Sequence, residues 1–211
     1  MISISGIEHQ EELEALPYFT KPAAGLLIGK KGKNLDKKIG RLSQIGFLKT
    51  LKKGMYTSSP FYESADKELY AQYLANRLRQ PSYLSLEYVL AKEGLIPESV
   101  YSLTSVTLKT PRSYTNFIGN FTYRNIRKPL FCGYAVKKWQ GKKIYLAGKA
   151  KALFDYFYLN EAADLEKGVV DARINPEALT GKDLAELAGY VSLAKSRKMV
   201  KILQIIKTYV S

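Results

Sequence analysis

The sequence predicts an α+β protein: a small N-terminal unit of helices closed by a β-hairpin, then a larger α+β part with a mostly antiparallel sheet and a helical C-terminus. Three observations lead to this prediction. Residues 33–45 carry two interleaved stripes at helical spacing, one apolar and one basic. Residues from Val100 to about Tyr145 are rich in β-branched and aromatic residues separated by turn signals. Helical spacing returns after residue 149.

The N-terminal unit is expected to begin with two short helices. The acidic segment 8–16 predicts the first of them. Thr20 is a suitable N-cap for the second, which should run to about Ile28, because Pro22 then falls in its first turn. The Gly-Lys-Lys-Gly segment at 29–32 predicts the turn that leads into a third helix.

The third helix is expected over residues 33–45, and Gly46 should end it. Its apolar stripe comprises Leu35, Ile39, Leu42 and Ile45. Its polar stripe comprises Asn34, Lys37, Lys38, Arg41 and Gln44. Lys, Arg, Asn and Gln are side chains that read base edges in a DNA major groove, so this helix has the composition of a recognition helix.

A short basic hairpin follows the third helix. Its strands are expected at Phe47–Leu51 and Met55–Ser58, joined by a Lys-Lys-Gly turn. A two-stranded wing directly behind a recognition helix predicts a winged helix-turn-helix. In that fold Lys49, Lys52 and Lys53 should contact the DNA backbone or the minor groove. On the helix, Asn34, Lys38, Arg41 and Gln44 are the candidates for base edges or nearby phosphates, and Lys37 should face phosphate.

The domain boundary is expected at Ser58-Ser59-Pro60, which divides the chain into residues 1–59 and residues 60–211. The second domain should open with a helix over Asp66–Arg79. Ser85 is expected to cap a short helix that follows.

Turn signals at Asn116–Gly119 and Gln140–Gly141 separate the predicted strands. A helix is expected at Lys149–Leu159, and the segment from Thr180 to Asp183 resembles a capping box that opens the helical C-terminus. The last helix is expected at about 196–209. Its predicted apolar side comprises Val200, Leu203 and Ile206.

The formal net charge is +14, and its distribution is uneven. Residues 21–53 hold ten Lys and Arg against one acid, Asp36, and residues 99–154 hold eleven Lys and Arg and no acid. Such asymmetry is the electrostatic footprint of a polyanion, so we expect a nucleic-acid partner. The acid-free region should offer a second basic surface. Its candidate residues are Arg112, Arg124, Arg127, Lys137 and Lys138.

The sequence lacks the motifs of common enzyme classes. His9 is the one histidine, and there is no HExxH, CxxC, Walker A or strand-linked GxGxxG motif. Asp155 and Glu161 are the one acid pair beside the strand region, and we expect them on the surface or at helix caps. We therefore expect no catalytic activity, no metal and no cofactor.

The sequence also indicates a compartment. The one cysteine, Cys132, excludes an internal disulfide and is expected to be a small buried hydrophobe in a reducing cytoplasm. No apolar run has the length of a membrane span, and the N-terminus has no signal-peptide pattern. We expect a cytoplasmic protein without a membrane partner.

The segment Leu27–Leu35, with its GKKG core, resembles the GXXG loop of KH domains. In that family the loop clamps a single-stranded nucleic-acid backbone. Ala24-Gly25 before it and Ile39 after it extend the likeness. The hairpin that follows has only a two-lysine turn, which is typical of a wing. The winged helix is therefore preferred, and a KH-like binder of single-stranded RNA is kept as an alternative.

A longer resemblance covers residues 81–134. Its recognisable pieces are Pro81-Ser82-Tyr83, Ser85-Leu86, Gly94-Leu95-Ile96-Pro97, Thr104-Ser105-Val106-Thr107, Arg112-Ser113 and the hairpin Gly119–Tyr123. Together they resemble the central domain of AbiEi-type antitoxins. Lys149–Asp155 is similar to that family's "PEKALLD" stretch, although the proline and glutamate are replaced. The likeness extends over most of the chain and weakens after about residue 160.

This resemblance implies an antitoxin of a type IV toxin–antitoxin pair, acting in abortive infection and antiviral defence. It implies binding to double-stranded DNA at inverted repeats in the protein's own promoter, with repression of the operon. The implied functional partner is a nucleotidyltransferase-like toxin, and neutralisation need not involve direct contact. A second alternative is an enzyme that modifies this toxin.

Overall fold

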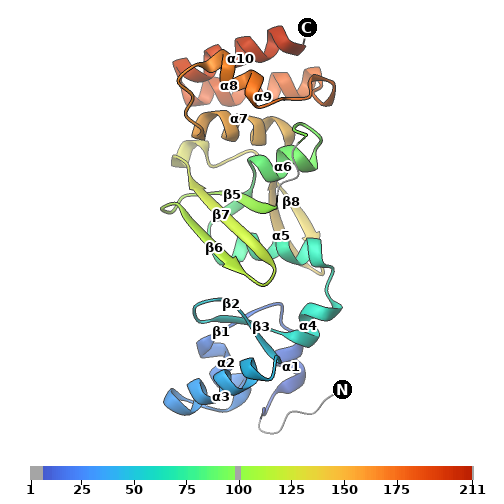
Figure 1. Ribbon diagram of the computed structural model, residues 1–211, viewed down its shortest axis with the longest axis vertical. Helices are drawn as coiled ribbons and strands as arrows, with labels where there is room; N and C mark the ends of the chain where they lie inside the picture. The colour runs from blue at the N-terminus through green and yellow to red at the C-terminus, as the bar shows by residue number, and fades with distance from the viewer. Residues whose placement is uncertain (1–6, 98–100, 211) are drawn as a thin grey trace. The chain divides into compact units, whose positions relative to one another are not determined.

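The computed structural model describes residues 7–97 and 101–210 (Figure 1). The described chain is α+β, as predicted. Contacts within the chain divide it into two compact units. The first runs through Ala71 and includes Thr115–Ile118, and the second comprises the segments 72–114 and 119–211. The division lies within α5 (Lys67–Leu78), later than the expected boundary at residues 58–60.

The first unit contains short helices and a small sheet. Its described elements are α1 (Gln10–Ala15), β1 (Phe19–Thr20), α2 (Lys21–Ile28), α3 (Gly32–Gln44), β2 (Leu48–Lys52), β3 (Met55–Ser58) and α4 (Ser59–Ser64). Strand β3 lies between β1 and β2 and is antiparallel to both. The predicted hairpin after the third helix is therefore confirmed.

Local signals set the ends of α2 and α3. The Thr20 hydroxyl accepts a hydrogen bond from the Ala23 amide, which confirms Thr20 as the N-cap of α2. Gly29 has a left-handed backbone (φ 70°) and ends α2. Gly46, with φ 76°, lies just beyond α3, as expected for a residue after a helix C-cap.

The apolar stripe of α3 builds the core of the first unit. Leu35, Ile39 and Leu42 are buried there, among residues that include Leu13 and Phe19. Ile45 was expected in this stripe, but its side chain is 59% exposed. Ile45 is the C-cap residue, and a helical step of about 100° per residue places it nearer to Lys38 and Arg41 than to the buried stripe.

The second unit contains a six-stranded sheet and a group of helices. After α5 its described elements are β4 (Ser82–Leu84), α6 (Glu87–Lys92), β5 (Ser102–Thr107), β6 (Arg112–Asn116), β7 (Gly119–Asn125), the 3-10 helix η1 (Lys128–Leu130), β8 (Tyr134–Trp139), β9 (Lys142–Ala147), α7 (Lys149–Leu159), α8 (Leu165–Asp171), the 3-10 helix η2 (Pro176–Ala178), α9 (Gly181–Ala194) and α10 (Arg197–Val210). The predicted start of the strand region at Val100 lies outside the described residues.

The sheet is mixed, so the expectation of a mostly antiparallel sheet is met only in part. The strand order is β6-β7-β5-β4-β9-β8. Pairs β4–β5 and β8–β9 are antiparallel, whereas β5–β7 and β4–β9 are parallel. Turn signals in the sequence predict the antiparallel direction only of strands that are joined by a hairpin. The parallel pairs join strands that are distant in sequence, and their direction has no local signal.

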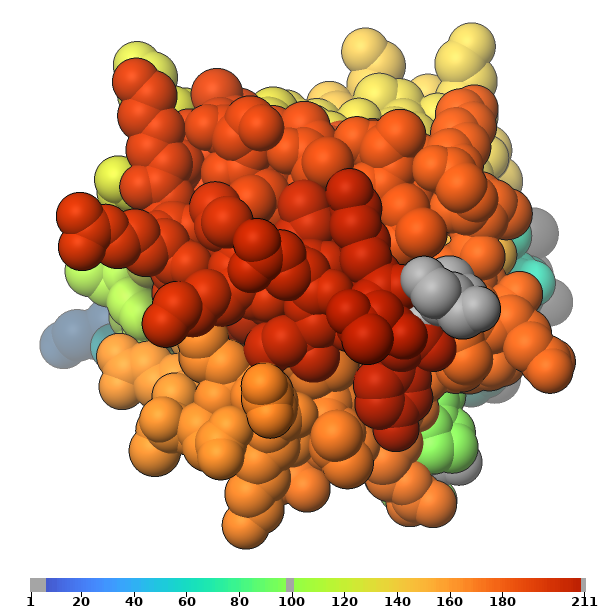
Figure 2. Space-filling view, turned by 90° about the horizontal axis from the view of Figure 1, so that it is seen from above, coloured from blue at the N-terminus to red at the C-terminus, as the bar shows by residue number. Residues whose placement is uncertain are grey.

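The C-terminal helices cover one end of this unit. Helix α7 lies between the sheet and helices α8 to α10 (Figure 1). The capping box at Thr180 and Asp183 is confirmed at the start of α9. Figure 2 shows α10, in red, across the middle of one face, with orange segments of α8 and α9 beside it.

The apolar side predicted for the last helix needs correction. Val200 is 48% exposed and Leu203 is only half-buried, whereas Met199, Ile202 and Ile206 are buried. These three buried residues also follow helical steps of three and four. Several adjacent stripes on this helix are apolar enough to be buried, and the packing of α8 and α9 selects one of them.

Asp155 lies in a buried polar network, so the expectation that it is on the surface or at a helix cap is wrong. Its Oδ1 atom is 2.5 Å from Lys151 Nζ, and both side chains have no exposed surface. Its Oδ2 atom accepts hydrogen bonds from the hydroxyls of Tyr83 (3.0 Å) and Ser85 (2.8 Å). Lys151 Nζ also donates to the Leu130 carbonyl. The network therefore joins α7, β4 and the segment before β8.

The same network explains the failed prediction that Ser85 caps α6. The Ser85 hydroxyl donates to Asp155, and Leu86 stands at the N-cap without a side-chain hydrogen bond.

Burial raises the pKa of the Asp155 carboxyl, while the charge and hydrogen bond of Lys151 and the two hydroxyl donors oppose that rise. Burial beside Asp155 also raises the pKa of Tyr83 far above its usual value.

Replacing Lys151 with methionine should leave the Asp155 carboxylate buried without its cation. We expect the free energy of unfolding to fall by about 3–5 kcal/mol near neutral pH. The matched control is Lys149→Met, because Lys149 is half-buried on the same helix and its ammonium donates to the Ala178 carbonyl instead of to a buried carboxylate. We expect a smaller loss from Lys149→Met, measured by urea denaturation.

The loss caused by Lys151→Met should depend on pH. Without the ammonium the pKa of folded Asp155 rises further, so the folded protein binds this proton more tightly than the unfolded chain does. Binding of this proton by the folded protein adds to the free energy of unfolding. The full contribution is present below the ordinary Asp pKa of 3.8, and it is lost as the pH rises through the raised pKa of the folded state. The Lys151→Met deficit should therefore be smaller at about pH 5 than at about pH 8. A deficit equal to that of Lys149→Met at both pH values would contradict the role of the pair.

Candidate nucleic-acid interface

The polar stripe of α3 faces solvent in the first unit. Asn34, Lys37, Arg41 and Gln44 are exposed, and Lys38 is half-buried. These positions repeat at helical steps of three and four along α3, and the buried residues Leu35, Ile39 and Leu42 lie on another side of the helix. The structure therefore places the five predicted α3 residues on one side of the helix, opposite the core.

The one acidic residue of α3 is paired. Lys21, the first residue of α2, makes an exposed ion pair with Asp36. A hydrogen bond from the Lys21 ammonium to Asp36 raises the pKa of that lysine. Because Asp36 already has a cationic partner, it offsets less of the positive charge that Lys37 and Arg41 present to solvent.

The three lysines of the β2–β3 hairpin differ in their surroundings. Lys53 is exposed in the turn, beside Gly54, which has a left-handed backbone (φ 74°). Lys52 is half-buried, at the point where the pairing register between the two strands shifts. Lys49 is also half-buried, and its Nζ lies 5.7 Å from the centre of the Tyr62 ring. Lys53 is therefore the hairpin lysine best placed for an external phosphate.

The Gly-Lys-Lys-Gly loop adds two more exposed cations to the first unit. Gly29 and Gly32 have φ of 70° and 54°, a region that glycine adopts without strain. Lys30 and Lys31 between them are exposed. The loop joins α2 directly to α3, so its lysines lie at the N-terminal end of the polar stripe.

Two of the five residues predicted for the second basic surface hold helix ends. The Arg124 guanidinium donates to the Leu159 carbonyl and to the Asn160 side chain at the C-terminal end of α7. Arg127 donates to the Ala194 carbonyl at the end of α9, at 3.1 Å. Unpaired carbonyls at a helix C-terminus favour such cationic donors. These two arginines therefore contribute to the fold of the second unit.

The other three residues do not form one surface. Arg112 is on β6 and Lys137 and Lys138 are on β8, which are the two opposite edges of the six-stranded sheet. Neighbouring strands are about 4.8 Å apart, so the two edges are separated by roughly 20 Å or more. Lys137 and Lys138 are consecutive on a strand and point to opposite faces.

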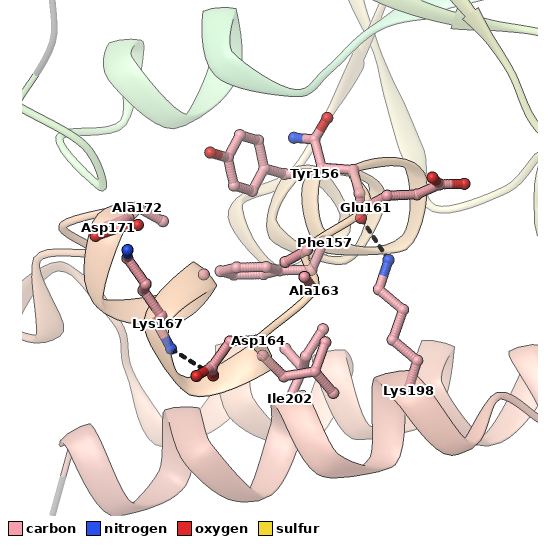
Figure 3. A pocket seen from close by; sticks show the side chains of 14 residues that line it. Tyr156, Phe157, Glu161, Ala163, Asp164, Lys167, Asp171, Ala172, Lys198 and Ile202 are labelled. Carbon is pink, nitrogen blue, oxygen red and sulfur yellow. Dashed lines mark hydrogen bonds between the residues drawn. The ribbon is translucent and has the colours of Figure 1, made fainter.

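A hollow of about 660 Å³ lies between the end of α7, α8 and α10 (Figure 3). Some of its polar side chains make hydrogen bonds at the ends of these helices. Lys198 donates to the carbonyls of Tyr158 and Asn160, and the Asp164 side chain caps α8 by accepting from the Lys167 amide. Burial lowers the pKa of Lys198. These contacts give Lys198 and Asp164 structural roles.

Cys132 is partly exposed, so the expectation that it is buried is wrong.

Sequence reasoning also missed Lys142 and Lys143, which lie on β9 beside the predicted Lys137 and Lys138. The period of two in a hairpin strand is the signal that would have grouped these lysines by face.

The described residues contain no group of three or more His, Cys, Asp or Glu side chains that could hold a metal ion. Among the helices that the structure describes, none combines the length and apolar character needed to cross a membrane. Compared with known proteins, the chain matches no protein-family model and no curated protein.

Proposed function

We propose that the protein is a transcriptional repressor that binds double-stranded DNA. Its first unit acts as a winged helix-turn-helix, with α3 in the major groove and the β2–β3 hairpin as the wing. The observation that carries this proposal is the solvent-facing stripe of Asn, Lys, Arg and Gln on a helix whose opposite side is buried, followed directly by a basic hairpin. An apolar back fixes the helix while leaving its polar side free to enter a groove.

The chemistry of the stripe suits both parts of DNA recognition. Arg41 can pair with the O6 and N7 atoms of guanine, and Asn34 and Gln44 can pair with the N6 and N7 atoms of adenine. Lys37, Lys38 and Lys53 meet phosphates, which position the protein without reading sequence.

We further propose that the repressor is the antitoxin of a type IV toxin–antitoxin operon and acts on its own promoter in the cytoplasm. The support is the resemblance of residues 81–134 to AbiEi-type antitoxins. Two compact units allow DNA binding and toxin neutralisation to reside in different parts of the chain. The functional partner would be a nucleotidyltransferase-like toxin.

A KH-like binder of single-stranded nucleic acid is the second candidate function. A specific observation favours it: the GKKG loop joins two helices, both of its glycines have left-handed backbones, and both of its lysines are exposed. A KH domain needs a strand, a variable loop, a second strand and then a helix around this core, and β2, β3 and α4 follow α3 in that order. Against it stands the short turn from β2 to β3, where the paired residues Lys52 and Met55 leave only Lys53 and Gly54 between them.

Binding to duplex DNA should weaken steeply with salt. If about five phosphates are neutralised by the α3 and hairpin cations, a plot of log affinity against log salt should have a slope of roughly −4 to −5. Fluorescence anisotropy with promoter duplex and with a single strand of the same sequence measures this. A slope near zero would reject the winged-helix assignment. So would tighter binding to the single strand that is lost when Lys38 and Arg41 are replaced with glutamate.

Arg41→Ala should separate specificity from affinity. Loss of a base contact should cost about 1–3 kcal/mol on the operator and much less on random duplex. Lys53→Ala is the matched control, because an exposed lysine at the hairpin turn should weaken binding to both duplexes by a similar factor. Equal losses on operator and random DNA for Arg41→Ala would show that Arg41 reads no base.

Replacing both Lys30 and Lys31 with aspartate discriminates between the two candidate functions. In a winged helix these residues lie beside the groove-facing helix, so we expect a partial loss of duplex binding through repulsion, with the fold retained. In a KH-like clamp the new acids would face the phosphate backbone directly. Complete loss of a tight complex with single-stranded RNA, at unchanged thermal stability, would favour the KH-like function.

A further inference from the structure

The β8–β9 hairpin of the second unit places aromatic and basic side chains on one face. The antiparallel register pairs Val136 with Tyr145 and Lys138 with Lys143. Residues two apart on a strand share a face, so Tyr134 belongs to the same side. The opposite face contains Trp139 and Ile144, which are both buried. The first face instead leaves Val136 and both lysines exposed.

A pocket of about 300 Å³ lies at one end of this face, between the hairpin, Phe131 and the C-terminal part of α5. Its aromatic wall is built by packing. The Tyr134 ring stacks on the buried Tyr83, with ring centres 4.8 Å apart. It also makes T-shaped contacts with Phe131 and Tyr145, with ring centres 5.5 and 5.7 Å apart. A volume of this size suits a group as large as a nucleobase.

Arg77 brings a cation to the same pocket. Arg77 lines the pocket, and its guanidinium lies 4.9 Å from the centre of the Tyr73 ring. Its Nε atom is buried and has no hydrogen-bond partner among the described residues. The neighbouring Asn76 differs, because its amide is already bonded to Ser82 and Tyr145. The buried Nε atom is out of reach of a ligand, so Arg77 contributes its positive charge to the pocket and not this hydrogen bond.

The exposed lysines extend the positive charge beyond the pocket. Lys138 and Lys143 are directly opposite each other on neighbouring strands, an arrangement of like charges that destabilises a hairpin. No acid occurs in residues 99–154 to neutralise them within that stretch. A bound anion would remove this repulsion. Strand β8 is also the edge of the sheet, so one side of the hairpin is open to a partner.

We propose that this face binds single-stranded nucleic acid. One unpaired base enters the pocket against Phe131, Tyr134 and Tyr145, its phosphate approaches Arg77, and the adjoining phosphates follow Lys138 and Lys143. Aromatic rings beside a line of cations are the general chemistry of single-strand binding, because every base has a face that can stack. This site lies in a different unit from the proposed duplex-binding surface and does not depend on it.

The arrangement favours a strand over other anions. An acidic peptide would pair with the lysines but has no flat group for the three rings. A single nucleotide would fill the pocket but leave the lysine pair unoccupied, since the pair lies one to two strand repeats away, or about 7–14 Å. A duplex keeps its bases stacked and cannot insert one into the pocket without unpairing.

The test uses the full chain and fluorescein-labelled hexathymidylate and hexauridylate in anisotropy titrations; tighter binding of one of them identifies DNA or RNA as the natural strand. Lys138→Glu with Lys143→Glu should weaken hexamer binding about tenfold or more, because two contacts with phosphate become repulsive. Lys137→Glu with Lys142→Glu is the matched control: the same charge change is made on the other face of the same hairpin. This control should weaken binding by less than about threefold, through long-range repulsion alone.

A second arm tests the stacking. A hexamer of abasic sugar-phosphate has the same charge but no bases, and it should bind about tenfold more weakly than hexathymidylate. Tyr134→Leu should remove most of that difference, and thermal unfolding checks that this variant is folded. The proposal is overturned if the hexamers do not bind, if the abasic strand binds equally well, or if the two lysine pairs behave alike.

Two further variants separate this site from the first unit. Lys38→Glu with Arg41→Glu should abolish duplex binding and leave hexamer binding within about threefold, because these residues belong to the other unit. The Lys30 and Lys31 aspartate variant should lose only part of its duplex binding, and it should also leave hexamer binding within about threefold. Loss of hexamer binding in that variant, with no effect of the Lys138 and Lys143 changes, would assign the single strand to the GKKG loop instead. A mononucleotide that competes with the labelled hexamer as strongly as an unlabelled hexamer does would also overturn the proposal, because binding would then need no phosphates along Lys138 and Lys143.

Discussion

The buried ion pair of Lys151 and Asp155 is the interaction on which the larger unit depends. It joins α7 to β4 through the Tyr83 and Ser85 hydroxyls, and to the segment before β8 through the Leu130 carbonyl. Burying both charges is costly, and the cost is offset only because every charged atom has a close partner. Tyr83 also supports Tyr134 by ring stacking, so the network beneath the sheet positions the aromatic wall of the proposed single-strand site.

The cations of this basic chain have two different tasks. Lys151, Arg124, Arg127 and Lys198 all donate to backbone carbonyls, three of them at or next to helix C-termini, and so they stabilise the packing of the C-terminal helices against the sheet. Lys37, Arg41, Lys138 and Lys143 face solvent. The net charge of +14 therefore overstates the charge available to a nucleic acid, and the proposed interfaces are defined by exposure and grouping.

Sequence reasoning succeeded where the signal was local. The Thr20 N-cap, the glycine that follows α3, the capping box of α9 and the bounds of α7 were all readable from neighbouring residues, because caps and helical periodicity involve contacts within a few positions. It failed where a distant partner decided the outcome. Ser85 has the chemistry of an N-cap, yet its hydroxyl donates a hydrogen bond to Asp155, which is 70 residues away in the sequence.

The sequence by itself determined the α+β class, the α3 stripe with its basic front, the hairpin behind it and the concentration of positive charge. Only the tertiary structure decided that the larger sheet is mixed, that Asp155 is buried, and that Arg112 and Lys138 lie at opposite sheet edges. It also placed Arg77 in the lining of one pocket with Tyr134 and Tyr145. The physical reason is range: helix ends and turns are set by neighbouring residues, whereas strand order and the neutralisation of buried charge depend on residues that only the folded chain brings together.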